Sequence, residues 1–223
     1  MHINCAVYST QVASSPNGET RPKEARRPGE RAGLTTEAVL DTSRRLIREH
    51  GAGGLSMRRI ASELGVLPNT LYSHVADKQA LLDALVDDLL GEIKPPPGRT
   101  WRDRAIGLTK ATRTALLAEP TVAMLYIQRA GRGPNAIRLG QQSMQIYADA
   151  GIPPAAGAEA FRVMIAYLVG FVGFELSRAT DQGEQRPVPR GSGVESLALA
   201  PGDKEFALGL EWLMDGIATL VED

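Results

Sequence analysis

One short stretch, LPNTLYSHV, places many hydrogen-bonding side chains on about two helical turns. They are Asn69, Thr70, Tyr72, Ser73 and His74. Pro68 precedes them and suits the first position of a helix. Asn, Thr and Ser are poor helix formers, so an exposed helix face built from them gives up local stability. Base edges and phosphates require such donors and acceptors, and the stretch therefore indicates a helix that reads DNA.

A preceding helix and a glycine turn would position this segment. Ser56 can cap a helix that ends at Gly65, where the turn needs a positive φ. Leu71 and Val75 would then pack the next helix down, and the spacing predicts that this helix runs from Pro68 to about Val75. A helix, a three-residue turn and a short second helix can present the second helix to the major groove.

The same apolar spacing, with caps and breakers, predicts helices along the rest of the chain and no strand-like alternation. The expected helices are 36–50, 56–64, 68–75, 77–93, 100–118, 121–130, 134–150, 154–179 and one from Asp203 onward. The fold class is therefore all-α. KPPPG at 94–98 divides a three-helix head with its fourth, linking helix (34–93) from a larger helical body (99–223). Residues 1–33 read as a disordered arm and 180–202 as a polar loop.

Composition allows a globular protein and narrows its surroundings. The chain has 223 residues, 43% of them hydrophobic, and a formal net charge of −1. Residues 21–60 hold ten Lys and Arg against five Asp and Glu, whereas 61–94 hold two against six. The single Cys5 excludes an internal disulfide, and the first fifteen residues lack the pattern of a signal peptide. The charge-free run 163–174 is too short to cross a bilayer, so we expect a cytoplasmic protein without membrane contact.

The segment LSMRRIASELGVLPNTLYSHVADKQALLDAL, residues 55–85, resembles the DNA-binding head of the tetracycline-repressor (TetR) family. Its marks are Leu-Ser-x-Arg-x-Ile-Ala-x-x-Leu-Gly-Val, then Thr-Leu-Tyr-x-His-Val, then Lys-x-x-Leu-Leu. The match covers residues 35–85, while the body matches only in helix order and length. The resemblance implies a ligand-responsive transcriptional regulator, usually a repressor, that binds a palindromic operator in double-stranded DNA as a homodimer and is released by a small molecule.

The resemblance also implies roles for nine residues of the head. Arg58 would reach a base edge or phosphate, which its neighbour Arg59 could not do at the same time. Pro68, Asn69 and Thr70 would meet bases. Tyr72, Ser73 and His74 would bind phosphates or flank bases, although Tyr72 and His74 could equally be packing residues. Lys78 would bind a phosphate, and Ser56 would add a backbone contact. Leu67-Pro68-Asn69 departs from the pattern of the family's tetracycline-binding branch, so the bases recognised do not transfer.

The body carries two helices suited to a dimer. FRVMIAYLVGFVGF, residues 161–174, is apolar nearly all round and must be covered on two sides. The last helix repeats apolar residues at spacings of 4, 3, 4 and 3, a heptad-like seam that ends at Leu220. The predicted dimer contacts are Phe174, Phe206, Leu210, Leu213 and Ile217. A monomeric core is the alternative.

Ten residues of the body could line a ligand cavity, although each of them alone could be plain core. They are Trp101, Met124, Tyr126, Gln128, Met144, Tyr147, Met164, Tyr167, Phe171 and Glu175. Gln128, Arg162 and Glu175 are the polar groups of interest if they are buried. No histidine follows His74, so neither a metal-held drug nor another cofactor is expected.

Two other classes of function compete with regulation. An enzyme would need a catalytic set, yet the histidines stand at 2, 50 and 74, outside the body, and no metal-ligand spacing or phosphate loop is present. An architectural protein that binds DNA of any sequence would need a more basic chain. The sequence therefore favours a regulator that is not an enzyme.

Overall fold

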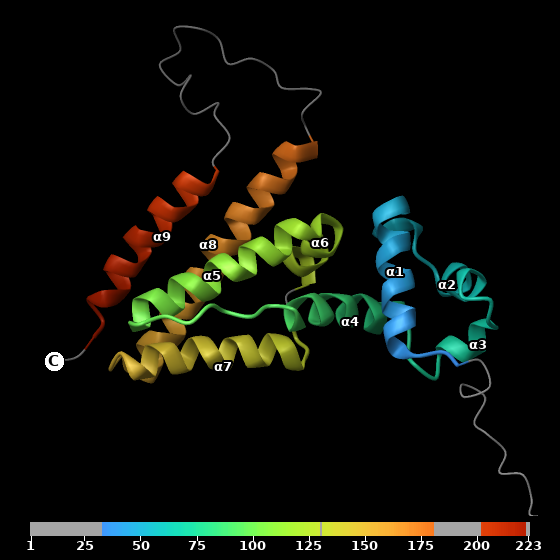
Figure 1. Ribbon diagram of the computed structural model, residues 1–223, viewed down its shortest axis with the longest axis horizontal. Helices are drawn as coiled ribbons and strands as arrows, with labels where there is room; N and C mark the ends of the chain where they lie inside the picture. The colour runs from blue at the N-terminus through green and yellow to red at the C-terminus, as the bar shows by residue number, and fades with distance from the viewer. Residues whose placement is uncertain (1–32, 130, 181–201, 222–223) are drawn as a thin grey trace, which may run out of the picture.

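The computed structural model describes residues 33–129, 131–180 and 202–221, and the regular structure within these ranges is entirely helical. The elements are α1 (Thr36–His50), the short 3₁₀ helix η2 (Ala52–Gly54), α2 (Met57–Glu63), α3 (Pro68–Leu71), α4 (Lys78–Gly91), α5 (Trp101–Ala118), α6 (Pro120–Arg129), α7 (Pro134–Asp149), α8 (Pro154–Thr180) and α9 (Asp203–Ala218). The all-α prediction is confirmed. Figure 1 shows α1, α2 and α3 at one end, α9 at the other, and α4 leading from the head into the body.

Local chemistry sets the ends of the helices in the head. Thr35 caps α1 by accepting a hydrogen bond from the amide of Ala38, and Ser56 caps α2 in the same way for Arg59. Gly65, with φ of 65°, makes the turn before α3. Leu71 is fully buried and fixes α3 to the head core.

The reading helix is shorter than the sequence suggests, because α3 ends at Leu71 and not near Val75. The hydroxyl of Ser73 donates to the carbonyl oxygen of Thr70 at 2.7 Å, and the amide of His74 bonds to Leu71 three residues back. Both contacts tighten the chain out of α-helical geometry, as Ser side chains often do near their own backbone. Tyr72, Ser73 and His74 therefore lie on a turn that follows α3.

The body is a bundle of helices that encloses the inner end of α4. α4 packs against α6 and α7, α5 packs against α7 and α8, and α8 also contacts α9. The N-terminus of α5 carries a capping box, in which the side chains of Thr100 and Asp103 each accept a hydrogen bond from the other's amide.

By length and composition alone, α8 is long and apolar enough to cross a membrane over Pro154–Arg178, a longer stretch than the charge-free run 163–174. Length and composition alone are weak support for a membrane span, because core helices share both. In the described part of the chain this helix packs against α5, α6, α7 and α9. One face of α8 is buried in this bundle, along Met164, Leu168 and Val172, and the other faces are half-buried or exposed. The expected arm and most of the polar loop between α8 and α9 lie outside the described residues.

Candidate DNA interface and ligand cavity

The turn and the first residues of α3 form the exposed surface of the head. Leu67, Pro68 and Asn69 are exposed, and Thr70 is half-buried. Tyr72 follows the helix with 52% of its surface exposed. The buried Leu71 holds these side chains outward, so that amide, hydroxyl and phenol groups gather on one open face.

Two cations on the helices before and after α3 have no acidic partner in the described chain. Arg58 on α2 is exposed, and Lys78 begins α4 directly after its cap, Asp77. Neither side chain makes an ion pair or a hydrogen bond to any residue in the described ranges. Arg59 is different, because its guanidinium contacts the ring of His50 at 2.6 Å. The geometry thus leaves Arg58, and not Arg59, available to DNA.

The arginines of α1 form ion pairs with acidic side chains. Arg45 pairs with Glu63 at 2.7 Å and with Glu49, and the Arg45 guanidinium lowers the pKa of the Glu63 carboxyl. Arg44 and Arg48 point toward α4 and the body. Lys78 and Arg58 therefore stand out as the free positive charges of the described head.

Three of the predicted DNA contacts also have structural roles. The Ser56 hydroxyl accepts from the Arg59 amide, and that of Ser73 donates to Thr70. His74 is half-buried; one ring nitrogen, Nδ1, lies 3.4 Å from the Thr36 hydroxyl, and the other, Nε2, is covered by protein without a partner in the described chain. This position favours packing for His74, so its phosphate contact stays a prediction.

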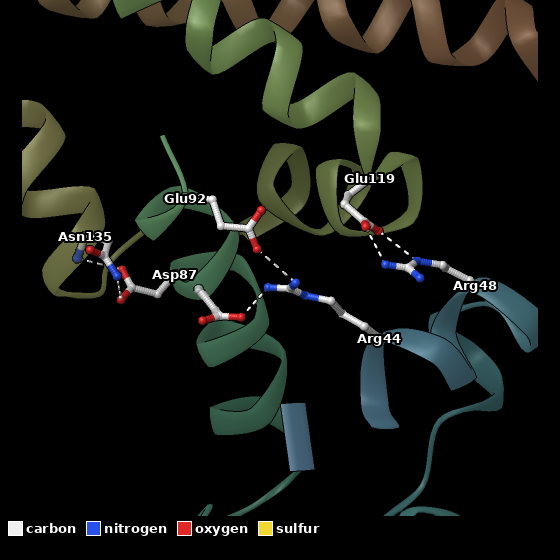
Figure 2. A network of polar contacts seen from close by, with 7 residues as sticks. Arg44, Arg48, Asp87, Glu92, Glu119 and Asn135 are labelled. Atoms are coloured by element: carbon white, nitrogen blue, oxygen red, sulfur yellow. Dashed lines mark hydrogen bonds and ion pairs between the residues drawn. The ribbon is translucent and has the colours of Figure 1, made fainter. Parts of the chain in front are cut away.

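Polar contacts join the head to the body through α4 (Figure 2). Arg44 of α1, largely buried, pairs with Asp88 and Glu92 near the end of α4. Arg48 pairs with Glu119, where α5 passes into α6. The head is therefore held both to α4 and directly to the body.

A second set of contacts fixes α4 to α7 (Figure 2). The carboxylate of Asp87 accepts from the amides of Asn135 and Ala136 at 2.9 and 3.2 Å, and from the Asn135 side chain at 3.0 Å. The α7 N-cap is Gly133, which has no side chain to offer, and a Cβ there would lie 2.3 Å from the Asp87 carboxylate. Asp87 thus caps α7 from another helix, and the Arg138 guanidinium adds a bond to the Leu90 carbonyl at 3.1 Å.

A cavity of about 400 Å³ lies beside this junction. Its wall comes from α4, α5, α6, α7, α8 and the segment between α6 and α7. The lining residues are Leu90, Leu108, Thr109, Thr112, Tyr126, Gly131, Ala136, Ile137, Leu139, Gly140, Ser143, Phe161, Ile165 and Leu168. Burial raises the pKa of the Tyr126 phenol, which keeps its proton on at neutral pH. This volume suits a small organic molecule.

Of the ten residues predicted for a ligand cavity, only Tyr126 lines this one. Met124 and Gln128 are exposed on α6, Trp101 is half-buried at the start of α5, and Met144, Tyr147 and Met164 pack between helices. The residues predicted from the sequence did not include Thr109, Thr112, Gly140 and Ser143. Two threonines three residues apart share one face of a helix, and a glycine in mid-helix often marks close approach or open space, so both patterns could have indicated them.

Tyr167, Phe171 and Glu175 lie instead where α8 meets α5 and α9. The rings of Tyr167 and Phe171 pack on Phe206, and the Tyr167 hydroxyl donates to the Phe206 carbonyl at 2.7 Å. Glu175 pairs with Arg113, at 2.9 Å from its Nε, and raises the pKa of that guanidinium. Arg162, the remaining polar group of interest, is exposed. This cluster joins α9 to the body.

The heptad-like seam of α9 faces the chain's own interior. Phe206, Leu210 and Ile217 are buried against the body, which corrects their assignment to a dimer contact, and Leu213 is half-buried. The exposed apolar residues of the two helices lie on other faces: Val163 and Phe174 on α8, and Leu208 and Trp212 on α9. Periodicity located an apolar stripe but did not determine which side of the helix a partner would meet.

Comparison with known proteins identifies the family of this chain. Residues 39–85 match the family model of bacterial regulatory proteins of the tetR family, and residues 94–200 match the tetracyclin repressor-like C-terminal domain. The chain is 31% identical over 204 residues to the class A tetracycline repressor protein from transposon 1721 of Escherichia coli, covering 83% of this chain and 91% of that protein.

Two solved structures are similar over most of their length. ActR of Streptomyces coelicolor in complex with actinorhodin is 25% identical, with a TM-score of 0.71 over 85% of this chain and 99% of that one. BioQ with its double-stranded DNA operator is 28% identical, with a TM-score of 0.63 over 83% and 99%. With its exposed reading helix, its unpaired Arg58 and Lys78 and the cavity in its body, the chain belongs to the TetR family of transcriptional regulators, which join a DNA-binding helix-turn-helix head to a ligand-binding body.

Proposed function

We propose that this chain is a repressor that binds an inverted-repeat operator as a homodimer and leaves it when an effector fills the body cavity. The observation that carries this proposal is that Arg58 on α2 and Lys78 at the start of α4 have no ion-pair partner in the described chain, while the start of α3 is exposed. Phosphates supply the charges that these side chains lack within the described chain. Asn69 and Thr70 belong to α3 and would read bases.

Relatives support both halves of the proposal. BioQ was solved with its DNA operator, and ActR with actinorhodin. The relatives are regulators rather than enzymes, and we assign this chain a binding role without catalysis, in the cytoplasm where bacterial DNA lies. The division into an arm (1–33), a head (34–93) and a body (99–223) is part of the proposal.

α4 is the element through which the cavity would act on the head. Leu90 of α4 lines the cavity, Asp87 one turn earlier caps α7, and Asp88 pairs with Arg44 of the head. An effector that fits the cavity better when α4 has shifted would move the head by as much as its differential affinity allows. Two heads moved in this way would no longer match half-sites one helical turn apart.

The dimer would use the exposed apolar residues of α8 and α9. Phe174, Leu208 and Trp212 are large and exposed, and α9 lies at the end of the body away from the head (Figure 1). Exposed aromatic residues of this kind are typical anchors of protein interfaces. Two reading helices on one face of DNA also require two copies of the head.

Selection from randomised duplexes tests the proposal directly. The purified protein is incubated with the pool at about 150 mM salt, and the retained DNA is sequenced. An inverted repeat with half-sites about ten base pairs apart is the expected result. Binding that fades with salt and enriches no sequence would instead identify a general DNA binder.

A further inference from the structure

Among the described residues, no charged side chain lines the cavity. Of its fourteen lining residues, Tyr126, Thr109, Thr112 and Ser143 are the ones with polar side-chain groups, and the rest are apolar or glycine. Burying an ion without an opposite charge costs several kcal/mol. A charged ligand would therefore find no counter-ion in this wall.

Three charged residues on the surrounding helices are already hydrogen-bonded to other protein groups. Asp87 holds the N-terminus of α7, and Arg138 donates to the Leu90 carbonyl and to Gln142. Arg113 of α5 pairs with Glu175 and Asp203. Each would have to leave a hydrogen-bonded partner to neutralise a ligand, which adds to the cost of binding an ion.

The four hydroxyl groups of the wall have complementary roles. Thr109, Thr112 and Ser143 donate their protons to carbonyl oxygens four residues earlier, at 2.9, 2.9 and 3.0 Å. Their oxygens can therefore only accept from a ligand. The Tyr126 hydroxyl has no partner in the described chain and, being protonated, can donate.

Space for the ligand comes partly from a glycine inside α7. Gly140 lines the cavity, and a Cβ at this position would meet one neighbour, the Phe161 ring, at 3.8 Å. A glycine inside a helix costs about 1 kcal/mol relative to alanine. A larger side chain at residue 140 would enter the space that the ligand needs.

We propose that the effector is an uncharged, largely apolar small molecule with an oxygen that accepts from Tyr126 and a hydroxyl or N–H that donates to the threonine and serine oxygens. This inference rests on the proposed function, since it concerns the ligand of the same cavity. It excludes anionic and cationic effectors, whose charge this wall would leave unpaired.

Two fluorescent probes that share one ring system test the charge rule. N-phenyl-1-naphthylamine is neutral, and 1-anilinonaphthalene-8-sulfonate is its anionic relative. Each is titrated into the full-length protein and into two variants: Gly140→Leu fills the cavity, and Ala148→Leu adds the same bulk at an exposed position on the same helix. Binding in the cavity is the part that Gly140→Leu removes and Ala148→Leu retains.

In the cavity, the neutral probe is expected to bind at least about tenfold more tightly than the sulfonate, a difference of about 1.4 kcal/mol. Gly140→Ala, which adds a single methyl group, is expected to weaken binding of the neutral probe partially. It serves as a control in case the leucine variant misfolds. Equal cavity binding of both probes, or no cavity binding of the neutral one, would overturn the inference. Operator selection on the same preparations reports separately on the proposed function.

Discussion

At the residue scale, the DNA face contains two kinds of side chain, and substituting them should change DNA binding in different ways. Lys78→Ala removes a point charge, so binding to every sequence should weaken and the slope of log affinity against log salt should fall by about one unit. Lys110→Ala, an exposed lysine of the body, is the matched control. Titrations of operator and unrelated DNA over a salt series provide the measurement.

Asn69 should behave differently, because an amide reads base edges while a lysine neutralises a phosphate. Asn69→Ala should cost about 1–3 kcal/mol on the preferred operator and relax the choice of base at one position of each half-site, with the salt slope unchanged. Repeating the selection with this variant gives the result. An unaltered preferred site would show that Asn69 reads no base.

Tyr147 gives the body a dependence on alkaline pH. Its side chain is almost fully buried, and burial raises the pKa of the phenol to about 12 from an ordinary value near 10. Between these values the folded state holds the proton more tightly than the unfolded state, so stability is complete below pH 10 and falls as pH rises toward 12. In the Tyr147→Phe variant, the decrease in the free energy of unfolding on raising the pH should be smaller by roughly 2–3 kcal/mol than in the original protein. Urea unfolding at several alkaline pH values measures this difference.

At the element scale, the capping of α7 by Asp87 ties two helices together. Asp87→Ala should lower the free energy of unfolding by about 1–2 kcal/mol, because three hydrogen bonds of the α7 N-terminus lose their acceptor. Asp83→Ala, on the same helix, removes a more exposed ion pair with Arg129 and should cost less than about 1 kcal/mol. Urea unfolding of both variants provides the comparison. Equal decreases in the free energy of unfolding would show that the cap stabilises the protein no more than an exposed ion pair does.

The sequence could predict the helices, because their ends depend on neighbours in the chain. Ser56, Asp77 and Thr100 each cap a helix through an amide three residues ahead. The cavity wall depends on which faces of several helices meet, and this is set by packing across the whole bundle. The residues predicted to line a ligand cavity therefore include Tyr126 but not Gly140 or Ser143. For the same reason the apolar stripe of α9 is predicted to contact a partner subunit, whereas in the structure it is buried against the chain's own core.

At the scale of the whole molecule, the two sites lie at opposite ends of α4, and neither touches the other. Arg58 is exposed on α2 and the half-buried Lys78 begins α4, while Leu90, near the other end of α4, forms part of the cavity wall. Arg44 and Arg48 fix the head to both α4 and the α5–α6 corner, so a shift of α4 changes one attachment relative to the other. This arrangement allows an effector to change the orientation of the head without contacting DNA.

Operator binding also requires a second copy, and the dimer prediction concerns Trp212. This side chain is 67% exposed on α9, beside the exposed Leu208. Trp212→Asp should place a charge in the interface, convert the dimer to monomer in sedimentation velocity, and weaken operator binding by at least about tenfold, because the two heads then bind without the benefit of linkage. Met124→Asp adds the same charge at an exposed apolar position of α6 and should leave the dimer intact. If Trp212→Asp stays dimeric, the interface lies on another face of the body, and the exposed residues of α9 need a different explanation.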